Sequence, residues 1–237
     1  MAEYRDPSHT ISANLLDVRA RLTRAAQRVN RDPSAIRLVA VSKTHPIDSV
    51  RAACLAGQFE FGENRVQEAL QKISLSSDTA IKWHLVGHLQ SNKARKAATV
   101  FACIHSIDSV DLLEQVDAAA LEAGRQPDVL MQVDLAGEPT KHGATLETLL
   151  PLFEAAAECR AARVTGLMVL PPFAEDPEET RPFFARLREI RDELGRRGVP
   201  SSMLRELSMG MSHDFEIAIE EGATLVRVGT ALFGDRG

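Results

Sequence analysis

The segment Leu38-Val39-Ala40-Val41-Ser42-Lys43-Thr44-His45-Pro46 begins with an unbroken apolar run and ends at a proline. Such a run predicts a strand buried in a parallel sheet, and Pro46 predicts the start of the helix that follows. Lys43 then lies at the carboxyl end of the strand, where α/β folds place their chemistry. Burial there disfavours the ammonium form, so the amine can attack a carbonyl and form a Schiff base. The alternative is a lysine that extends its ammonium group to solvent from a strand end.

The same alternation of strands and helices continues along the chain. The predicted strands are residues 37–43, 59–64, 82–87, 103–108, 128–135, 163–170, 206–210 and 225–229, and an amphipathic helix over residues 11–29 precedes them. Helix boundaries are marked by Gly57, Gly124 and Gly222 after helix ends, and by Asp108 or Ser109 and Ser212 or Asp214 before helix starts. This alternation predicts an α/β fold, the (β/α)8 TIM barrel, with an extra N-terminal helix. An open doubly wound sheet is the competing fold, but it normally has a glycine-rich turn after its first strand, which residues 41–44 lack.

Composition limits the domain organisation and the partners. The chain has 237 residues, 44% of them hydrophobic, and no linker-like segment divides it, so we expect one domain over residues 1–237. A net charge of −5 argues against a nucleic-acid binder. No segment approaches the roughly 20 apolar residues of a membrane helix, and residues 1–6 lack the apolar region of a signal peptide. Three widely spaced cysteines indicate reduced thiols, so we expect a cytoplasmic protein without a metal site.

In a barrel, the carboxyl ends of all strands meet on one face. Those ends carry Lys43, Gly62-Glu63-Asn64, His84 with Gly87, Asp108, Asp134, Met168 with Pro171, Ser208-Met209-Gly210 and Arg227-Val228-Gly229-Thr230. Barrels often bind phosphate with the loops after strands 7 and 8, and both loops here are rich in glycine and hydroxyl groups. Ordinary turn chemistry uses the same residues and is the alternative for each loop taken singly.

Arg227 completes a combination of three features. Alternation places it on the same strand face as Gly229. An outward-facing arginine, or half of an ion pair, is the usual interpretation of such a residue. If it faces inward, its guanidinium only donates hydrogen bonds and keeps its charge, so a pyridine nitrogen opposite it would stay unprotonated. A Schiff-base lysine, a phosphate cup and this arginine together indicate pyridoxal 5'-phosphate.

Six sequence blocks stand in order along nearly the whole chain. They are Val39-Ala40-Val41-Ser42-Lys43, Phe61-Gly62-Glu63-Asn64-Arg65-Val66-Gln67-Glu68, Trp83-His84-Leu85-Val86-Gly87-His88-Leu89-Gln90-Ser91-Asn92-Lys93, Gly166-Leu167-Met168, Leu207-Ser208-Met209-Gly210-Met211-Ser212 and Val226-Arg227-Val228-Gly229-Thr230-Ala231-Leu232-Phe233-Gly234. Together they resemble the pyridoxal-phosphate homeostasis protein family, also called the proline-synthetase co-transcribed protein family. The resemblance implies a fold-type III pyridoxal-phosphate-binding barrel like the N-terminal domain of alanine racemase.

The resemblance also implies a role for each predicted site residue. Lys43 would carry the cofactor as a Schiff base, and Arg227 would face the pyridine nitrogen. The other implied cofactor-binding residues are Ser208, Gly229 and Thr230 at the phosphate, Met209 and Gly210 beside it through their backbone, Asn64 and His84 at the ring, and Met168. Four features depart from the family pattern beside this site: His88, Asp134, Leu170-Pro171-Pro172 and His213.

The predicted role is that of a cofactor carrier without robust catalysis. Racemisation needs an acid–base group on both faces of the substrate, and the related racemases take the second one, a tyrosine, from an additional C-terminal domain. This sequence ends at Gly237 and its only tyrosine is Tyr4. The resemblance implies a part in vitamin B6 homeostasis and in amino-acid and keto-acid balance, with pyridoxal-phosphate-dependent apoenzymes as candidate partners. We expect a monomer without catalytic residues. A weak racemase and a cofactor-free Schiff-base aldolase are the alternatives.

Several conspicuous residues are expected to have structural roles only. Trp83 is expected to pack in the core. His105 and His142 are expected to be solvated or structural. Glu63 is expected to pair with Arg65 or Lys72. Residues 93–96 are basic and are expected to form a solvated helix face.

Overall fold

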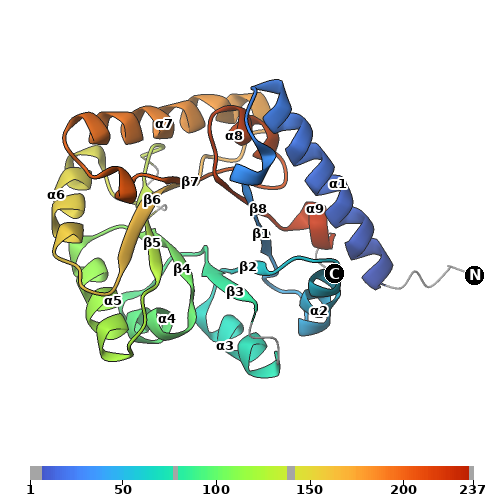
Figure 1. Ribbon diagram of the computed structural model, residues 1–237, viewed down its shortest axis with the longest axis horizontal. Coiled ribbons are helices and arrows are strands. Elements are labelled where there is room, and N and C mark those ends of the chain that lie inside the picture. The colour runs from blue at the N-terminus through green and yellow to red at the C-terminus, as the bar shows by residue number, and fades with distance from the viewer. Residues whose placement is uncertain (1–6, 77–79, 138–141, 235–237) are drawn as a thin grey trace, which may run out of the picture.

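The computed structural model of the protein is a closed barrel of eight parallel strands with helices around it (Figure 1). It describes residues 7–76, 80–137 and 142–234. The strands are β1 (Arg37–Val41), β2 (Glu60–Glu63), β3 (Lys82–Leu85), β4 (Cys103–Ile107), β5 (Asp128–Val133), β6 (Arg163–Val169), β7 (Glu206–Ser208) and β8 (Leu225–Val228). Neighbours in sequence pair in parallel, and the pairing of β1 with β8 closes the barrel. The predicted fold is confirmed.

All eight predicted strands are present, and each ends one or two residues earlier than predicted. The first strand shows why. Its backbone leaves the sheet at Ser42, and Thr44 adopts a φ of 67°, a left-handed conformation that cannot continue a strand. Apolar periodicity does not show where the hydrogen bonds between neighbouring strands end, so the predicted strands extend into the loops. Lys43 consequently lies in the turn after β1.

Helices surround the barrel on its outside: α1 precedes β1, α9 follows β8, and the others connect successive strands (Figure 1). They are α1 (Pro7–Arg28), α2 (Ile47–Leu55), α3 (Val66–Leu75), α4 (Ala94–Val100), α5 (Val110–Glu122), α6 (Leu146–Ala157), α7 (Arg181–Arg196), α8 (Phe215–Glu220) and α9 (Thr230–Phe233). Ser109 caps α5 by accepting a hydrogen bond from the backbone N–H of Leu112 (3.3 Å). Gly57, Gly124 and Gly222 have positive φ after their helices, as predicted. None of the helices within the described residues is long and apolar enough to cross a bilayer.

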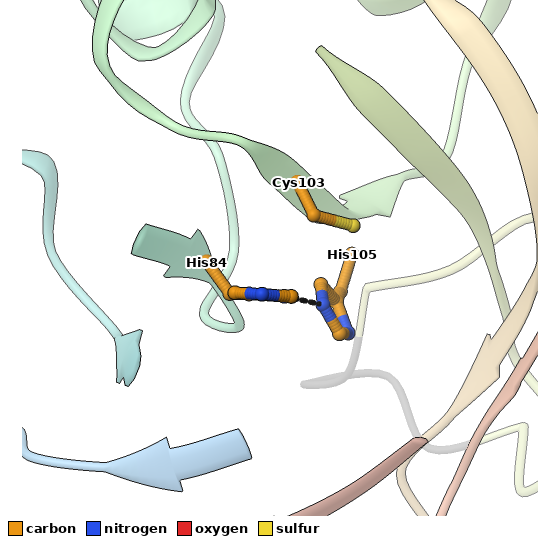
Figure 2. A group of neighbouring side chains, drawn as sticks. All are labelled: His84, Cys103 and His105. Carbon is orange, nitrogen blue, oxygen red and sulfur yellow. Dashed lines mark hydrogen bonds between the residues drawn. The ribbon is translucent and has the colours of Figure 1, made fainter. Parts of the chain in front are cut away.

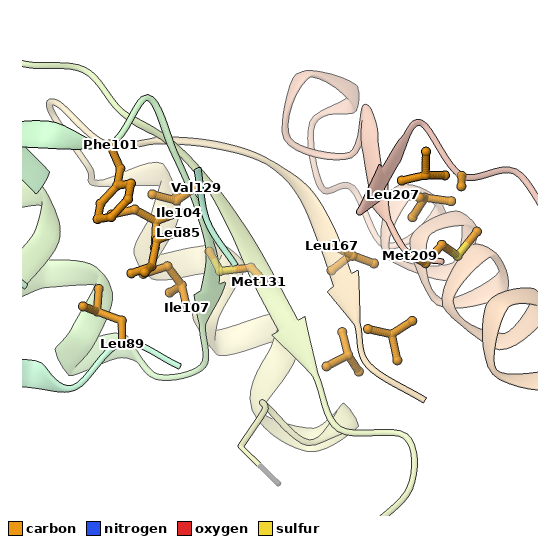
Figure 3. Packing of buried hydrophobic residues seen from close by; sticks show 14 of the residues in the cluster. Leu85, Leu89, Phe101, Ile104, Ile107, Val129, Met131, Leu167, Leu207 and Met209 are labelled. Carbon is orange, nitrogen blue, oxygen red and sulfur yellow. The ribbon is translucent and has the colours of Figure 1, made fainter. Parts of the chain in front are cut away.

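The main core lies between the barrel and its helices (Figure 3). Alternate strand residues such as Leu85, Ile104 and Met131 point outward and pack beneath the helices with Phe101 and Leu89. Each fully buried side chain of this size contributes about 1.5–3 kcal/mol by leaving water. Trp83 also belongs to this core, with its ring 5.8 Å from that of Phe61, so its predicted packing role is confirmed.

A second, smaller apolar cluster fills the inside of the barrel. Val39, Val41, Val86, Leu130 and Met168 are among its members. Leu38 and Ala40 belong to the outer core, so the side chains of β1 alternate strictly between outside and inside. Lys43 follows this strand by two residues, in the turn at the barrel's carboxyl end.

Candidate functional site

A buried ion-pair network supports the turn that carries Lys43. The ammonium Nζ of Lys72 donates hydrogen bonds to the Ser42 carbonyl oxygen (2.7 Å) and to one carboxylate oxygen each of Glu63 (2.7 Å) and Glu68 (2.9 Å). The Ser42 hydroxyl donates to the same Glu63 oxygen (2.6 Å). Burial raises the pKa of Glu63, and Lys72 opposes that rise. The predicted pairing of Glu63 with Lys72 is confirmed, and it joins α3 to the ends of β1 and β2.

Arg227 on β8 points inside the barrel and is almost fully buried. Its Nη1 donates to the Ser208 hydroxyl oxygen (2.6 Å), and its Nη2 donates to the Val169 carbonyl oxygen (2.9 Å). Burial lowers the pKa of Arg227 to about 10, so the guanidinium remains charged near neutral pH. Arg227 is therefore a rigid, charged donor fixed between the ends of β6 and β7.

Two buried histidines extend this contact across the barrel. His105 on β4 lies between Ser208 on β7 and His84 on β3. Its Nδ1 is 2.8 Å from the Ser208 hydroxyl oxygen. Its Nε2 is 2.9 Å from Nδ1 of His84 (Figure 2). Burial lowers the pKa of His84 to about 3 and that of His105 well below its usual value, so both rings are neutral. Beyond His84, the nearest carboxylate oxygen belongs to Glu60, 3.6 Å from Nε2 of the ring.

The hydrogen-bond partners favour one direction for the protons of this chain. Arginine can only donate, so the Ser208 oxygen accepts from Arg227. We assign the buried Ser208 proton to Nδ1 of His105, because this direction leaves the hydroxyl with an acceptor. The neutral His105 then carries its proton on Nε2 and donates it to Nδ1 of His84. The proton of His84 is left on Nε2, on the side of the Glu60 carboxylate. We call the series Arg227, Ser208, His105 and His84 the barrel relay.

Cys103 lies beside the two histidines, and the three ligand atoms fall within 4.8 Å of one another (Figure 2). Both nitrogens of His105 and Nδ1 of His84 are already used in the relay. Burial raises the pKa of the Cys103 thiol, which disfavours the thiolate that binds metals. The group is therefore arranged as a hydrogen-bonded chain, and a metal ion there would have to break it.

The loops after β7 and β8 form a cradle of backbone donors. The N–H groups of Gly229 and Ala231 both donate to the hydroxyl oxygen of Ser212, at 3.1 and 3.2 Å. Gly210 has a φ of 90°, and a Cβ there would lie 2.6 Å from that of Ala218. Only glycine fits this turn. Both amides point at one oxygen, so a phosphate oxygen would have to replace the Ser212 hydroxyl to be bound by them.

The structure brings some of the predicted site residues together. His84, Ser208 and Arg227 are joined through the barrel relay, and Gly229 lies beside β1, where a Cβ on it would be 3.3 Å from the Val41 carbonyl oxygen. Asn64 and Lys43 are half-buried in the loops after β2 and β1.

The other predicted residues are placed differently. Met168 lies in the apolar cluster inside the barrel. Met209 packs its side chain into the outer core near Leu207 (Figure 3), so only its backbone can reach the carboxyl face. Thr230 is exposed at the first position of α9.

The departures from the family pattern lie around the carboxyl end of the barrel. The rings of His88 and His142 stack with centroids 3.5 Å apart, and Nδ1 of His88 is 3.9 Å from a carboxylate oxygen of Asp108. Asp134 accepts from two backbone N–H groups of its own loop. The Nε2 of His213 is 3.0 Å from the Glu175 carbonyl oxygen. Tyr4 and Gly237, on which the expectation about catalysis drew, lie outside the described residues.

Sequence reasoning missed the contacts of two residues. His105 was expected to be solvated or structural, and it is fully buried and bonds to Ser208 and His84. Ser212 was expected to cap a helix and to end the phosphate-type loop after strand 7, but not to accept from the two amides of the β8 loop. A strand-interior histidine two positions from Cys103 on the same strand face was the available signal for the first.

Comparisons with known proteins agree with this architecture. The family model described as alanine racemase, N-terminal domain, matches residues 14–237. The pyridoxal phosphate homeostasis protein of Aquifex aeolicus is 44% identical over 216 residues, which cover 91% of this chain and 94% of that protein. The protein of the same name from Pseudomonas aeruginosa is 43% identical over 228 residues, 96% of each chain.

Two solved structures extend the comparison. PipY of Synechococcus elongatus with pyridoxal phosphate bound superposes with a TM-score of 0.84 at 41% identity, covering 94% of this chain and 100% of that chain. An alanine racemase of Clostridium difficile gives a TM-score of 0.73 at 14% identity, covering 94% of this chain and 56% of that chain. This second likeness concerns the fold alone.

Proposed function

Because this chain belongs to the pyridoxal phosphate homeostasis protein family, we propose that it binds pyridoxal 5'-phosphate at the carboxyl end of its barrel and serves intracellular vitamin B6 homeostasis. PipY, a relative of the same fold, binds this cofactor. The observation that carries the proposal is the arrangement of three adjacent strands, β7, β8 and β1. The amide cradle, the charged Arg227 and the turn that carries Lys43 belong to these neighbouring strands and their loops, which supports the proposal.

The described residues fit the two ends of the cofactor. The cradle formed by the Gly229 and Ala231 amides, with Ser212 and Thr230, would hold the phosphate. Arg227 has more N–H groups than its two hydrogen bonds use, so it can donate to the pyridine nitrogen. Asn64, in the loop after β2, would line the ring.

Lys43 is the proposed covalent anchor. Its Nζ would replace the aldehyde oxygen of the cofactor as a Schiff base, with release of water. Pyridoxal phosphate supplies an electron-withdrawing ring for carbanion chemistry when it is bound. Arg227 weakens that property, because a permanently charged donor keeps the ring nitrogen unprotonated.

Ser208 and His84 would act on the cofactor through Arg227. The Ser208 hydroxyl is engaged by Arg227 and His105, and His84 lies one step further inside the barrel. We propose that Ser208 positions the arginine and that the histidines hold Ser208. Met209 and Gly210 would contribute their backbone to the proposed site. Met168 would form part of its floor.

The proposed role is that of a carrier without robust turnover. It matches the homeostasis name that relatives such as those of Aquifex aeolicus and Pseudomonas aeruginosa bear. We further propose that the chain works as one cytoplasmic, monomeric domain that exchanges cofactor with pyridoxal-phosphate-dependent apoenzymes. A weak amino-acid racemase is the alternative activity. Incubation with single L-amino acids in heavy water tests it, because repeated deuterium incorporation at Cα would contradict the carrier role.

Borohydride reduction followed by peptide mass mapping tests the cofactor site. We expect a pyridoxyl group on Lys43 in the wild-type protein and no such group in Lys43→Ala. Lys96→Ala removes an exposed lysine of α4 and should leave the labelling unchanged. A label on another lysine, or none at all after loading with the cofactor, would refute the proposal.

A further inference from the structure

Two side chains of α3 contact the backbone of the turn that carries Lys43. Glu68 and Lys72 are four residues apart on this helix, so they lie on the same face of it. Nζ of Lys72 is 2.9 Å from a carboxylate oxygen of Glu68. We call these two residues the α3 clamp.

The α3 clamp holds the peptide bonds on both sides of Lys43. Nζ of Lys72 donates to the Ser42 carbonyl oxygen (2.7 Å), which belongs to the peptide bond before Lys43. The Thr44 N–H, which belongs to the peptide bond after Lys43, donates to a carboxylate oxygen of Glu68 (2.5 Å). One helix therefore fixes the backbone immediately before and immediately after the proposed anchor.

The contact with Glu68 falls on a residue in an unfavourable conformation. Thr44 has a φ of 67°, in the left-handed region that β-branched residues rarely adopt. Such a conformation persists only where the surrounding structure determines it, and such residues cluster at functional sites. Because Thr44 directly follows Lys43, its conformation sets the path of the chain beyond the lysine.

Glu68 accepts this hydrogen bond as a carboxylate. Burial disfavours its ionised form, but the hydrogen bonds from Lys72 and Thr44 outweigh that effect, so the pKa of Glu68 lies below its usual value. Hydrogen bonds to an ionised acceptor are stronger than neutral ones. Lys72 also neutralises the buried Glu63, whereas the Glu68 side chain is 24% exposed. Glu68 can therefore be replaced without leaving a buried charge unpaired.

On the basis of the proposed function, we infer that Glu68 is a positioning residue for Lys43. Through the Thr44 N–H it holds the turn in the conformation from which the Lys43 amine reaches the cofactor aldehyde. In that reaction the amine nitrogen bonds to the aldehyde carbon, and the aldehyde oxygen leaves as water with both amine protons. A turn that leaves this conformation is competent for a smaller fraction of the time, and the apparent affinity falls by that fraction.

Two forms of the cofactor distinguish positioning from binding. Pyridoxal 5'-phosphate carries the aldehyde that reacts with Lys43, whereas pyridoxamine 5'-phosphate carries an amine there and binds without a covalent bond. We expect Glu68→Ala to weaken binding of pyridoxal 5'-phosphate about tenfold, the effect of losing one hydrogen bond to a charged group. Binding of pyridoxamine 5'-phosphate should not change. Glu68→Gln keeps a side-chain oxygen for the Thr44 N–H and should recover part of the affinity.

Equal losses for the two forms in Glu68→Ala would overturn the inference, because they would show a general effect on the fold. No loss for either form, or a glutamine variant as weak as the alanine variant, would overturn it too. Asp48→Ala is the matched control, since it removes a carboxylate that pairs with Arg51 on α2 (2.7 Å). It should leave both affinities unchanged.

Lys43→Ala separates this inference from the proposed function. It should weaken binding of pyridoxal 5'-phosphate and leave that of pyridoxamine 5'-phosphate unchanged. Equal affinity of Lys43→Ala and the wild type for pyridoxal 5'-phosphate would overturn the proposed function and the inference together. The expected result for Lys43→Ala, with wild-type affinities in Glu68→Ala, would overturn the inference alone.

Discussion

Ser208→Ala probes the centre of the barrel relay. The substitution removes one hydroxyl that accepts from the Arg227 guanidinium at 2.6 Å and contacts Nδ1 of His105 at 2.8 Å. A hydrogen bond to a charged group contributes about 1.5–3 kcal/mol and a neutral one about 1 kcal/mol. Because the site is fully buried, water cannot replace either partner, so we expect a loss of about 3 kcal/mol in the free energy of unfolding.

Chemical denaturation with Ser106→Ala as the matched control measures this loss. Ser106 is equally buried, but its hydroxyl makes a single neutral hydrogen bond to the Gly87 carbonyl oxygen (2.8 Å). We expect about 1 kcal/mol for this control, so the two variants should differ by about 2 kcal/mol. An equal loss in both would refute the claim that Ser208 anchors a charged arginine.

Cofactor affinity provides a second measurement on the same variant. If Ser208 acts by positioning Arg227 at the ring nitrogen, Ser208→Ala should weaken binding of pyridoxal and of pyridoxal phosphate by the same factor. If Ser208 instead contacts the phosphate directly, only the phosphorylated form should bind more weakly. If the affinities for pyridoxal and pyridoxal phosphate fall by different factors, the positioning role of Ser208 is refuted, whatever the effect on the free energy of unfolding.

Three further predictions concern the surrounding structure. Lys72→Met leaves the Glu63 carboxylate buried without its cation, so it should lower the free energy of unfolding by about 3–5 kcal/mol near neutral pH. The loss should be much smaller below the ordinary glutamate pKa of about 4.3, where the carboxyl group is neutral. A loss that does not depend on pH in denaturation experiments would contradict this. Gly210→Ala should lower the free energy of unfolding by about 2 kcal/mol or more, because it combines a positive φ with a steric clash. Gly124→Ala has a positive φ in open space and should lower it by about 1 kcal/mol. Equal melting temperatures for the two variants would contradict the clash. The two relay histidines stay neutral when folded and take up protons when unfolded, so the free energy of unfolding should fall as the pH decreases from about 6.5 to about 5, by up to about 1.4 kcal/mol per unit for each ring. Replacing both by glutamine should flatten that slope, and His9→Gln should not; an unchanged slope in the double variant would contradict their buried, neutral state.

The strand pattern was largely readable from the sequence because it depends on neighbours along the chain. Apolar runs and turn residues predicted all eight strands and their order, but they included Lys43 in the first strand, which ends at Val41. Strand ends were overestimated, since the end of a hydrogen-bond ladder depends on the neighbouring strand. The Glu63–Lys72 pair could be foreseen because its members are nine residues apart and belong to consecutive elements.

The loops after β7 and β8 were recognisable as motifs, but their contacts were not. The convergence of two amides on Ser212 depends on the approach of the loops after β7 and β8, which no local pattern describes. Met209 illustrates the same limit: the motif includes it, while the direction of its side chain into the outer core follows from the sheet.

The sequence by itself determined the order of strands and helices, the alternation that puts Arg227 on the strand face of Gly229, and the position of Lys43 near a strand end, because these follow from periodicity over a few residues. Only the tertiary structure decided that Arg227 points inward and which groups it contacts. His84, His105 and Ser208 are separated by 21 and 103 residues along the chain, and they become neighbours because the barrel closes and turns alternate residues of β3, β4 and β7 toward one interior. Their burial makes the histidines neutral, and the donor-only arginine makes the Ser208 oxygen an acceptor.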